Sequence, residues 1–154
     1  MSIESIALIG VLTLLTIVLG TDLFFLLVGR RAFSDVADSS LLDVMGHLHQ
    51  VAGQRMIVVF VILFIGALTL NFTSHTRTEI YLLRIGLGSL LIYAALVIFG
   101  STPLNNKIAE ALNTDSISNV RLWHQTWEWL LWPRALAALF SFWSFLHYAM
   151  NPKV

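Results

Sequence analysis

Residues 56–72 read MIVVFVILFIGALTLNF, a run of 17 residues without a charge. About 20 apolar residues are enough for an α-helix to cross the hydrocarbon core of a membrane. The run has no period-two alternation, and inside lipid only helices and closed barrels satisfy every backbone hydrogen-bonding group. Reading back to residue 41 lengthens the same helix. This stretch therefore predicts a membrane-spanning helix, and it defines the solvent in which the chain folds.

Three further apolar runs have the same character. Together the four runs predict membrane helices at about residues 4–29, 41–73, 79–101 and 117–150. A Thr102-Pro103 pair follows the third helix and is typical of a helix start. Apolar residues then recur every four positions up to Leu112, which predicts a short amphipathic helix at about 103–113, lying on the membrane interface. The expected fold is an all-α membrane four-helix bundle that forms a single transmembrane domain, residues 1–154.

Composition excludes several classes of function. Hydrophobic residues make up 57% of the 154 residues and charged residues only 12%, about half the charged fraction of average soluble chains. A water-soluble enzyme is therefore nearly excluded. The formal net charge is zero and no basic run occurs, which argues against a nucleic-acid partner. The chain has no cysteine, so disulfides, iron–sulfur clusters and thiolate zinc sites are excluded.

Basic residues are biased toward one side of the expected membrane. The first and third connections and the nearby helix ends carry Arg30, Arg31, Arg55, Lys107 and Arg121. The opposite side carries Arg77, Arg84 and Lys153. This bias predicts that the first and third connections lie in the cytoplasm and that both termini lie outside. The expected location is the bacterial inner membrane.

A shift of 75 residues aligns the two halves of the chain without a gap. Leu48-His49-Gln50 then falls on Trp123-His124-Gln125. Parallel repeats in membrane proteins are related by an axis along the membrane normal, so His49 and His124 would lie at one depth near the bundle axis. Chance similarity between apolar helices is the alternative interpretation.

Ionisable residues gather near the side of the first and third connections. A charged group near the centre of a membrane helix costs at least about 2.5 kcal/mol, so each one suggests a function. Asp22 lies inside the first helix, whereas Arg121, His124 and Glu128 are spaced three and four residues apart and share a helical face.

The second helix carries two histidines at the same membrane side. His47 lies on a polar stripe with Asp43 and Gln50, whereas His49 lies on a different stripe. The repeat favours an inward-facing His49 and the polar stripe favours an inward-facing His47. The sequence leaves this choice open.

Three kinds of chemistry fit these groups. His49, His124, Glu128 and Asp22 could ligate a transition metal, since imidazole and carboxylate suit iron, copper, zinc or manganese. A haem could take axial ligands from His124 and from His49 or His47. Without a metal, His124 would act as a general base, with Glu128 orienting it and Arg121 holding an anionic substrate. Glu128 and Asp22 are thus expected catalytic partners of His124. Simple polarity at the membrane interface is the competing explanation.

A ten-residue stretch of the fourth helix contains four tryptophans, at positions 123, 127, 129 and 132. An aromatic belt at the membrane interface explains them adequately. Alternatively, Trp123 and Trp127, beside the candidate ligands, would form a stacking wall for a flat aromatic molecule. Farther along the helix, Arg134 lies near mid-membrane, where it needs a partner, and Asp22 is one candidate.

The segment Pro103-Leu104-Asn105 and the Trp- and Arg-rich start of the last helix resemble the anthrone-oxygenase-like family of small four-helix membrane proteins. Asn119-Val120-Arg121 approximates the family's Asn-x-x-Arg element, with the arginine one residue early. Gly29-Arg30-Arg31 stands where the family commonly has a proline. The resemblance implies a four-helix bundle and, for a minority of members, oxygenation of polycyclic phenols.

These observations favour a membrane-embedded, oxygenase-like oxidoreductase acting on a hydrophobic aromatic or quinone-like substrate. A metal or haem would supply the redox chemistry, while Asn105 and Arg121 would hold polar groups of the substrate. The alternative is a non-catalytic small subunit or assembly factor of a larger membrane complex. Expected partners are the lipid bilayer and a hydrophobic small molecule, with a homo-oligomer or a larger membrane complex as the expected assembly.

Overall fold

The computed structural model describes residues 2–73, 77–114 and 116–150, and these are almost entirely helical. Two long helices each contain a π-helical turn without a break in the chain direction. The first consists of α1 (Ile3–Phe24), η1 (Phe25–Gly29) and α2 (Arg30–Ser34), and the third of α4 (Arg77–Ala95), η2 (Leu96–Ser101) and α5 (Thr102–Asn113). The second and fourth are α3 (Asp38–Thr73) and α6 (Val120–Met150).

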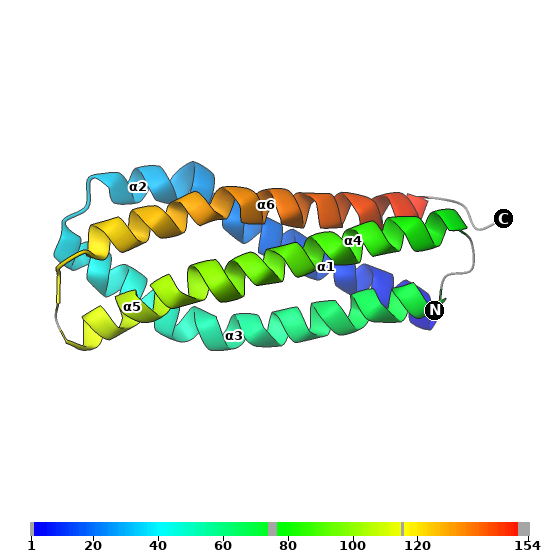
Figure 1. Cartoon of the computed structure of the whole chain (residues 1–154), viewed down its shortest axis with the longest axis horizontal. Coiled ribbons are helices and arrows are strands. Elements are labelled where there is room, and N and C mark those ends of the chain that lie inside the picture. Colours follow the sequence, from blue (N-terminus) through cyan, green and yellow to red (C-terminus); the bar gives the residue numbers. More distant parts are fainter. Residues whose placement is uncertain (1, 74–76, 115, 151–154) are drawn as a thin grey trace.

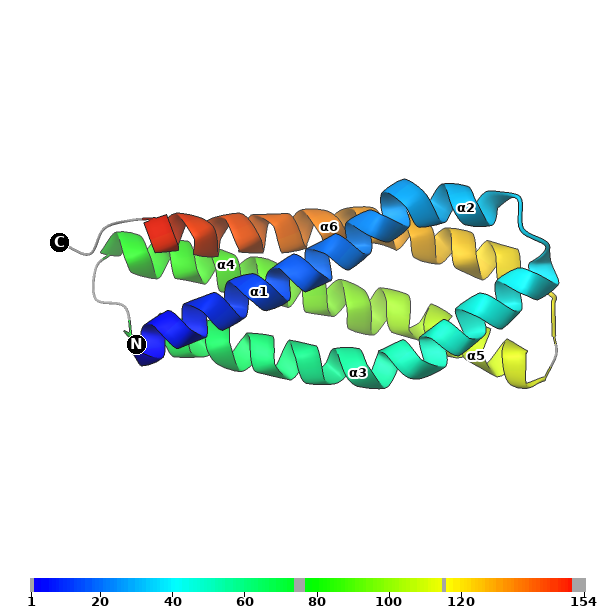
Figure 2. The same ribbon diagram turned by 180° about the vertical axis from the view of Figure 1, so that it is seen from behind.

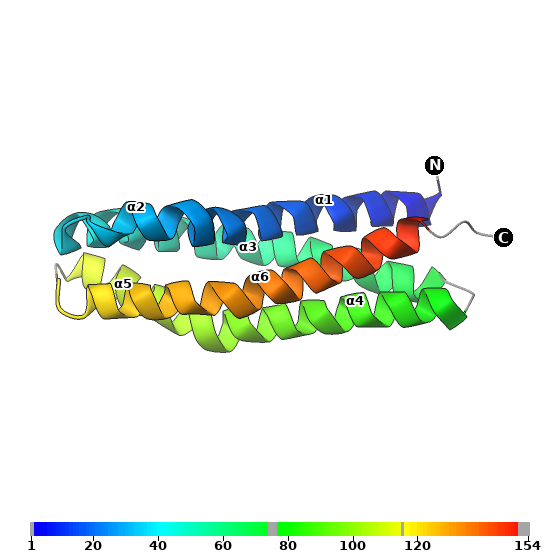
Figure 3. The same cartoon turned by 90° about the horizontal axis from the view of Figure 1, so that it is seen from above.

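The four long helices lie side by side and alternate in direction (Figure 1, Figure 2). Segments α2 and α5 and the first turns of α3 and α6 gather at one end of the molecule, which we call the α5 end. The beginning of α1 and the last turns of α6 lie at the opposite end (Figure 3). Short connections between long apolar helices produce this antiparallel course.

Four helical stretches are long and apolar enough to cross a membrane: Ile3–Ser34, Arg55–Thr73, Arg77–Asn113 and Val120–Met150. Their outward-facing side chains include many large apolar residues, such as Phe72 at 85% exposure and Phe99 at 81%. Exposure of this apolar surface to water would be unfavourable, whereas lipid tails solvate it. Lys153, which entered the orientation argument, lies outside the described residues.

The interior differs between the two ends of the molecule. Toward the end where α1 begins, the core is a cluster of leucine, valine and alanine with Phe145 and Tyr148. Gly86 of α4 makes room for this ring, because an added Cβ would lie 2.8 Å from Phe145 Cε2. Toward the α5 end, the core around Leu41, Ile108 and Trp127 also includes buried histidines. Polar chemistry is therefore concentrated in the α5 half.

The expected interfacial helix is the main correction to the predicted fold. Helix α5 begins at Thr102, close to the predicted residue, but it continues α4 through η2 instead of lying separately on the interface. Proline removes one helical hydrogen bond without necessarily ending a helix, and Pro103 lies two residues beyond the end of the π-helical turn at Ser101. The apolar face of α5 packs against α3. The Leu112 side chain lies so close to Gly46 that an added Cβ at this glycine would be 2.8 Å from Leu112 Cβ.

The halves of the chain have the same order of elements, as the predicted repeat requires. Each half has a long helix with one π-helical turn, followed by an uninterrupted long helix. The π-helical turns begin at Phe25 and Leu96, 71 residues apart by subtraction, so they do not share the 75-residue register. The first helix also extends to Ser34, beyond the predicted end at residue 29.

Candidate functional site

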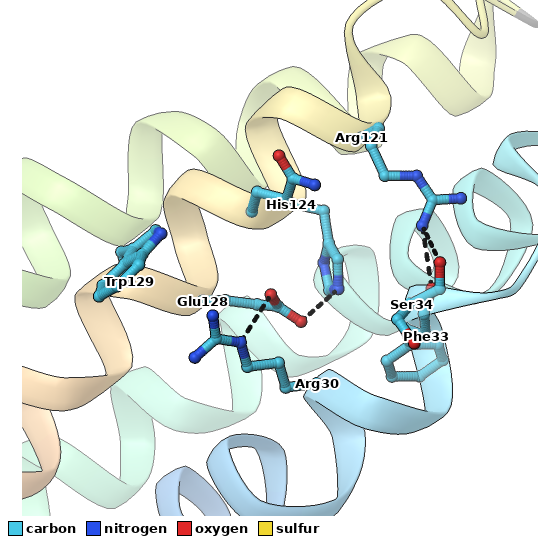
Figure 4. A pocket seen from close by; sticks show the side chains of 8 residues that line it. Arg30, Phe33, Ser34, Arg121, His124, Glu128 and Trp129 are labelled. Carbon is cyan, nitrogen blue, oxygen red and sulfur yellow. Dashed lines mark hydrogen bonds and ion pairs between the residues drawn. The ribbon is translucent and has the colours of Figure 1, made fainter.

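A cavity of about 390 Å³ opens at the α5 end between α2 and α6. Its walls combine aromatic, cationic and acidic side chains, and Figure 4 shows them converging from the two helices. The lining residues are Arg30, Phe33, Ser34, Arg121, His124, Gln125, Glu128 and Trp129. The cavity is therefore amphiphilic, with proton-active groups next to aromatic rings.

His124 and Glu128 form the centre of this cavity, as their spacing predicted. His124 is buried, and its Nε2 lies 3.2 Å from Glu128 Oε1. This is an ion-pair distance without hydrogen-bond alignment, since neither ring nitrogen of His124 has a hydrogen-bond partner among the described residues. Arg30 Nε lies 3.9 Å from Glu128 Oε2, and its guanidinium lies 5.2 Å from the centre of the Trp129 ring. The carboxylate is thus placed between an imidazole and a cation.

Trp127 connects the two histidines of the predicted repeat. Its indole stacks on His124 with ring centres 5.9 Å apart and meets His49 nearly edge-on at 5.4 Å. Both imidazoles are buried, His49 with 8% exposure and His124 with 2%. The two histidines therefore lie close together inside the molecule, both in contact with the same indole.

The structure resolves which histidine of α3 faces inward. His47 is exposed, whereas His49 is buried. His49 lies before the apolar span Arg55–Thr73, and burial lowers its pKa from 6.5 to about 4, with smaller contributions from the charges of His124 and Arg134. Because of this low pKa, His49 is neutral at pH 7. His47, which is exposed, cannot serve as an internal ligand.

Asp22 belongs to a different group of residues. Its Oδ1 accepts a hydrogen bond of 2.6 Å from Arg134, which also donates to Tyr93 Oη and Ser101 Oγ at 3.0 Å each. The depth of Arg134 predicted that it needs a partner, and Asp22 was one candidate. Asp22 is also absent from the lining of the cavity that holds His124 and Glu128, so the structure does not bring it together with the other expected catalytic and metal-binding residues.

The proposed metal and haem sites do not fit these residues. Within residues 2–73, 77–114 and 116–150, no group of three or more His, Asp or Glu side chains could hold a metal ion. The predicted ligands His49, His124, Glu128 and Asp22 are split, since Asp22 is paired elsewhere. For a haem, His49 and His124 would have to face one space, but His124 lines the cavity and His49 does not.

Arg121 has a structural role that the sequence did not reveal. It donates to Asp38 Oδ1 from Nε at 2.8 Å and from Nη2 at 2.6 Å. It also donates to the carbonyl oxygens of Phe33 at 3.0 Å, Ser34 at 3.1 Å and Val36. Its donors therefore cap the end of α2 and tie the α2–α3 connection to α6. An additional substrate anion would have to displace these contacts.

The other expected substrate-binding residues lie away from the cavity. Trp127 is buried behind it, and Trp123 lines a second, shallower cavity of about 290 Å³ beside Lys107 and Glu110. Asn105 is half-buried on α5 and is absent from both cavity linings. The predicted stacking wall at Trp123 and Trp127 is thus replaced by Phe33 and Trp129.

Sequence reasoning missed Arg30 and Phe33 as site residues. Both lie on α2, which begins where the first apolar run ends at Gly29. They are three residues apart, a spacing that places them on one face only if the helix continues. The available signal was the absence of proline after Gly29 in Gly29-Arg30-Arg31, which permits that continuation.

Comparison with known proteins finds no matching family model, no matching curated protein and no matching solved structure. The similarity to the anthrone-oxygenase-like family therefore remains a prediction based on the short Pro103-Leu104-Asn105 segment.

Proposed function

We propose that this protein is a membrane-embedded, oxygenase-like oxidoreductase whose substrate is a hydrophobic aromatic or quinone-like molecule bound at the α5 end. The observation that carries the proposal is the cavity itself, in which His124 and Glu128 face aromatic walls from Phe33 and Trp129. Pockets for hydrophobic ligands typically combine apolar walls with a few convergent polar groups. The four apolar spans would form a membrane four-helix bundle that delivers such a molecule from the lipid.

His124 would act as the proton acceptor. Glu128 lies beside Nε2 and favours the tautomer with hydrogen on that atom, which leaves a lone pair on Nδ1. Glu128 would also stabilise the imidazolium that forms when Nδ1 takes a proton. The imidazole is neutral before the reaction and charged after it, so the carboxylate stabilises the later state more strongly.

Deprotonation is the step that this chain's residues can supply. A phenol or hydroquinone loses an electron far more readily as its anion, so removal of the hydroxyl proton by His124 promotes oxidation. The electrons would pass to dioxygen or to a second quinone as co-substrate. Arg30, half-exposed at the cavity and 3.9 Å from Glu128, would stabilise the negative charge on the substrate oxygen through its guanidinium.

The test uses purified protein in lipid vesicles with 2-methyl-1,4-naphthohydroquinone as the probe. We expect faster hydroquinone oxidation and oxygen uptake than in empty vesicles, and His124→Ala should lower the rate by about 100-fold, the lower range for loss of a general base. His47→Ala is the matched control, because this imidazole is exposed at the same end and its loss should leave the rate unchanged.

Equal rates in His124→Ala and the unmodified protein would contradict the catalytic role. Quenching of tryptophan fluorescence by the corresponding quinone measures binding separately. Quenching without any turnover would replace the enzyme with a binding subunit, and the absence of both would remove the proposed substrate class.

A further inference from the structure

The α5 half of the interior contains polar atoms that no protein group satisfies. Among the described residues, seven buried side-chain nitrogen and oxygen atoms lack a hydrogen-bond partner. They are Asp22 Oδ2, His49 Nε2, Asn105 Oδ1, His124 Nδ1 and Nε2, Trp127 Nε1 and Arg134 Nε. Of these, only His124 Nε2 has an ion-pair contact, with Glu128 Oε1 at 3.2 Å. These side chains come from α1, α3, α5 and α6, so the missing partners do not result from the distortion of one helix.

Such atoms are unfavourable in a protein of this kind. A buried polar group without a partner costs about 1–3 kcal/mol, and lipid offers no hydrogen bonds to compensate. His49, His124, Trp127 and Asp22 are each at least nine-tenths buried. One such atom could be tolerated, but this many within one half of the molecule requires a partner that the side chains themselves do not provide.

The chemistry of the atoms identifies that partner. Trp127 Nε1 and Arg134 Nε can only donate a hydrogen bond, whereas Asp22 Oδ2 and Asn105 Oδ1 accept. Each neutral imidazole presents one donor and one acceptor. A partner must therefore be small and must both donate and accept, and buried water is the molecule that commonly fills this role with about three hydrogen bonds each.

The positions of the atoms suggest a continuous series. Ser101 accepts a hydrogen bond from Arg134 at 3.0 Å, and Asn105 follows one helical turn later on the same face. His49 and Trp127 are in ring contact at 5.4 Å. Trp127 and Arg134 are seven residues apart in α6, about 10 Å along the helix at 1.5 Å per residue, a span that a few waters can bridge.

The apolar interior of the other half of the molecule would end this series of polar atoms. Val11, Leu15, Leu63, Leu83 and Phe145 form an apolar cluster with at most 1% exposure each. Apolar interiors stay dry, so water would not extend past this cluster. Within the α5 half, water would lie only beside the polar atoms, because Trp127 also packs against apolar residues such as Leu41 and Ile108. His124 lines the cavity and provides the connection to bulk water.

We propose that the α5 half holds an internal water site that runs from His124 past His49, Trp127 and Asn105 to the Asp22–Arg134 pair. The bound ligand is water, and the site is a half-channel that ends at the dry apolar cluster. The hydration does not depend on the enzymatic activity proposed above. If that activity exists, this water gives His124 a route for exchanging protons with the interior.

Exchange of the indole N–H groups with D₂O tests this directly. The chain has five tryptophans, so ¹⁵N-tryptophan labelling in lipid nanodiscs gives five indole signals, assigned with single Trp→Phe variants. We expect the buried Trp127 N–H to exchange at least about tenfold faster than that of Trp132. Burial alone predicts the reverse order, because Trp132 is 49% exposed. In a membrane, however, Trp132 would face lipid, which contains no water for exchange.

A matched pair of variants then locates the path. Asn105→Leu should slow exchange at Trp127 by about tenfold, while Asn106→Leu, at the exposed neighbouring position, should leave it unchanged. If Asn105→Leu does not fold, the nuclear Overhauser effect between water and the Trp127 indole in the unmodified protein provides an independent measurement. Exchange at Trp127 no faster than at Trp132, or the absence of that Overhauser effect, would overturn the proposal.

Discussion

At the scale of single residues, Asp22 and Arg134 form a buried ion pair. Nη2 of Arg134 lies 2.6 Å from Asp22 Oδ1, and the two side chains are 11% and 2% exposed. Taking two charges out of water is costly, and removing one partner leaves an uncompensated charge, whereas replacing both by apolar groups is often nearly neutral. The pair therefore stabilises the fold mainly in comparison with a variant in which only one of the two charged side chains has been replaced.

This asymmetry leads to a double-mutant prediction. Arg134→Met should lower the free energy of unfolding by about 3–5 kcal/mol, because Asp22 is left buried without its cation. The double variant Asp22→Leu, Arg134→Met should be markedly more stable than Arg134→Met alone. Thermal unfolding midpoints in a mild detergent measure both. A double variant that is no more stable than Arg134→Met would show that the cost does not arise from the unpaired carboxylate.

At the scale of helices, close contact between α4 and α6 depends on one of two neighbouring glycines. A Cβ at Gly86 would lie 2.8 Å from Phe145 Cε2 and 3.1 Å from two further ring carbons, whereas a Cβ at Gly88 would meet no atom within 4 Å. The carbonyl oxygen of Gly86 also accepts a hydrogen bond of 2.9 Å from Ser141 Oγ. Gly86 thus sets the separation of these helices, and Gly88 does not.

The two alanine substitutions should consequently have different effects on the free energy of unfolding. Gly86→Ala should destabilise the protein by about 1–3 kcal/mol, since the added methyl group forces the Phe145 ring to shift in a packed core. Gly88→Ala should be neutral or stabilising by up to about 1 kcal/mol, because alanine favours the helix more than glycine does. Comparison of the two unfolding midpoints checks this, and equal destabilisation by both would contradict it.

At the scale of the whole molecule, the cavity, the buried histidines and the Arg121 contacts all lie in the α5 half. The basic residues Arg30, Arg31, Lys107 and Arg121 lie in the segments at the same end. Positively charged residues favour the cytoplasmic side of a membrane. We therefore expect the cavity to open toward the cytoplasm, with both ends of the chain outside.

Cysteine labelling measures this orientation, because the chain has no cysteine of its own. Ser39 is exposed at the α5 end and Thr78 is exposed at the opposite end. A membrane-impermeant maleimide should label Thr78→Cys in intact bacterial spheroplasts and should label Ser39→Cys only after lysis. The reverse pattern would place the cavity outside the cell and would show that the charge bias does not determine the topology.

The sequence determined the features that depend on local composition and helical spacing. Runs such as residues 56–72 predicted the long apolar helices, because lipid permits few alternatives for an unpaired backbone. The spacing of His124 and Glu128 predicted their contact, because residues four apart meet on any helix. The position of Arg134 near mid-membrane predicted that it needs a partner, with Asp22 as one candidate, because a lone charge there is too costly.

Only the tertiary structure decided the features that depend on how the helices are rotated and joined. Whether His47 or His49 faces inward depends on the rotation of α3 against its neighbours, and a shift of two residues along a helix turns a side chain by about 200° at 3.6 residues per turn. The continuation of α4 into α5, and of α1 into α2, depends on π-helical turns that no residue pattern announced. That continuation brings Arg30 and Phe33 to the cavity, and packing between helices, which a linear sequence does not specify, directs Arg121 to the backbone.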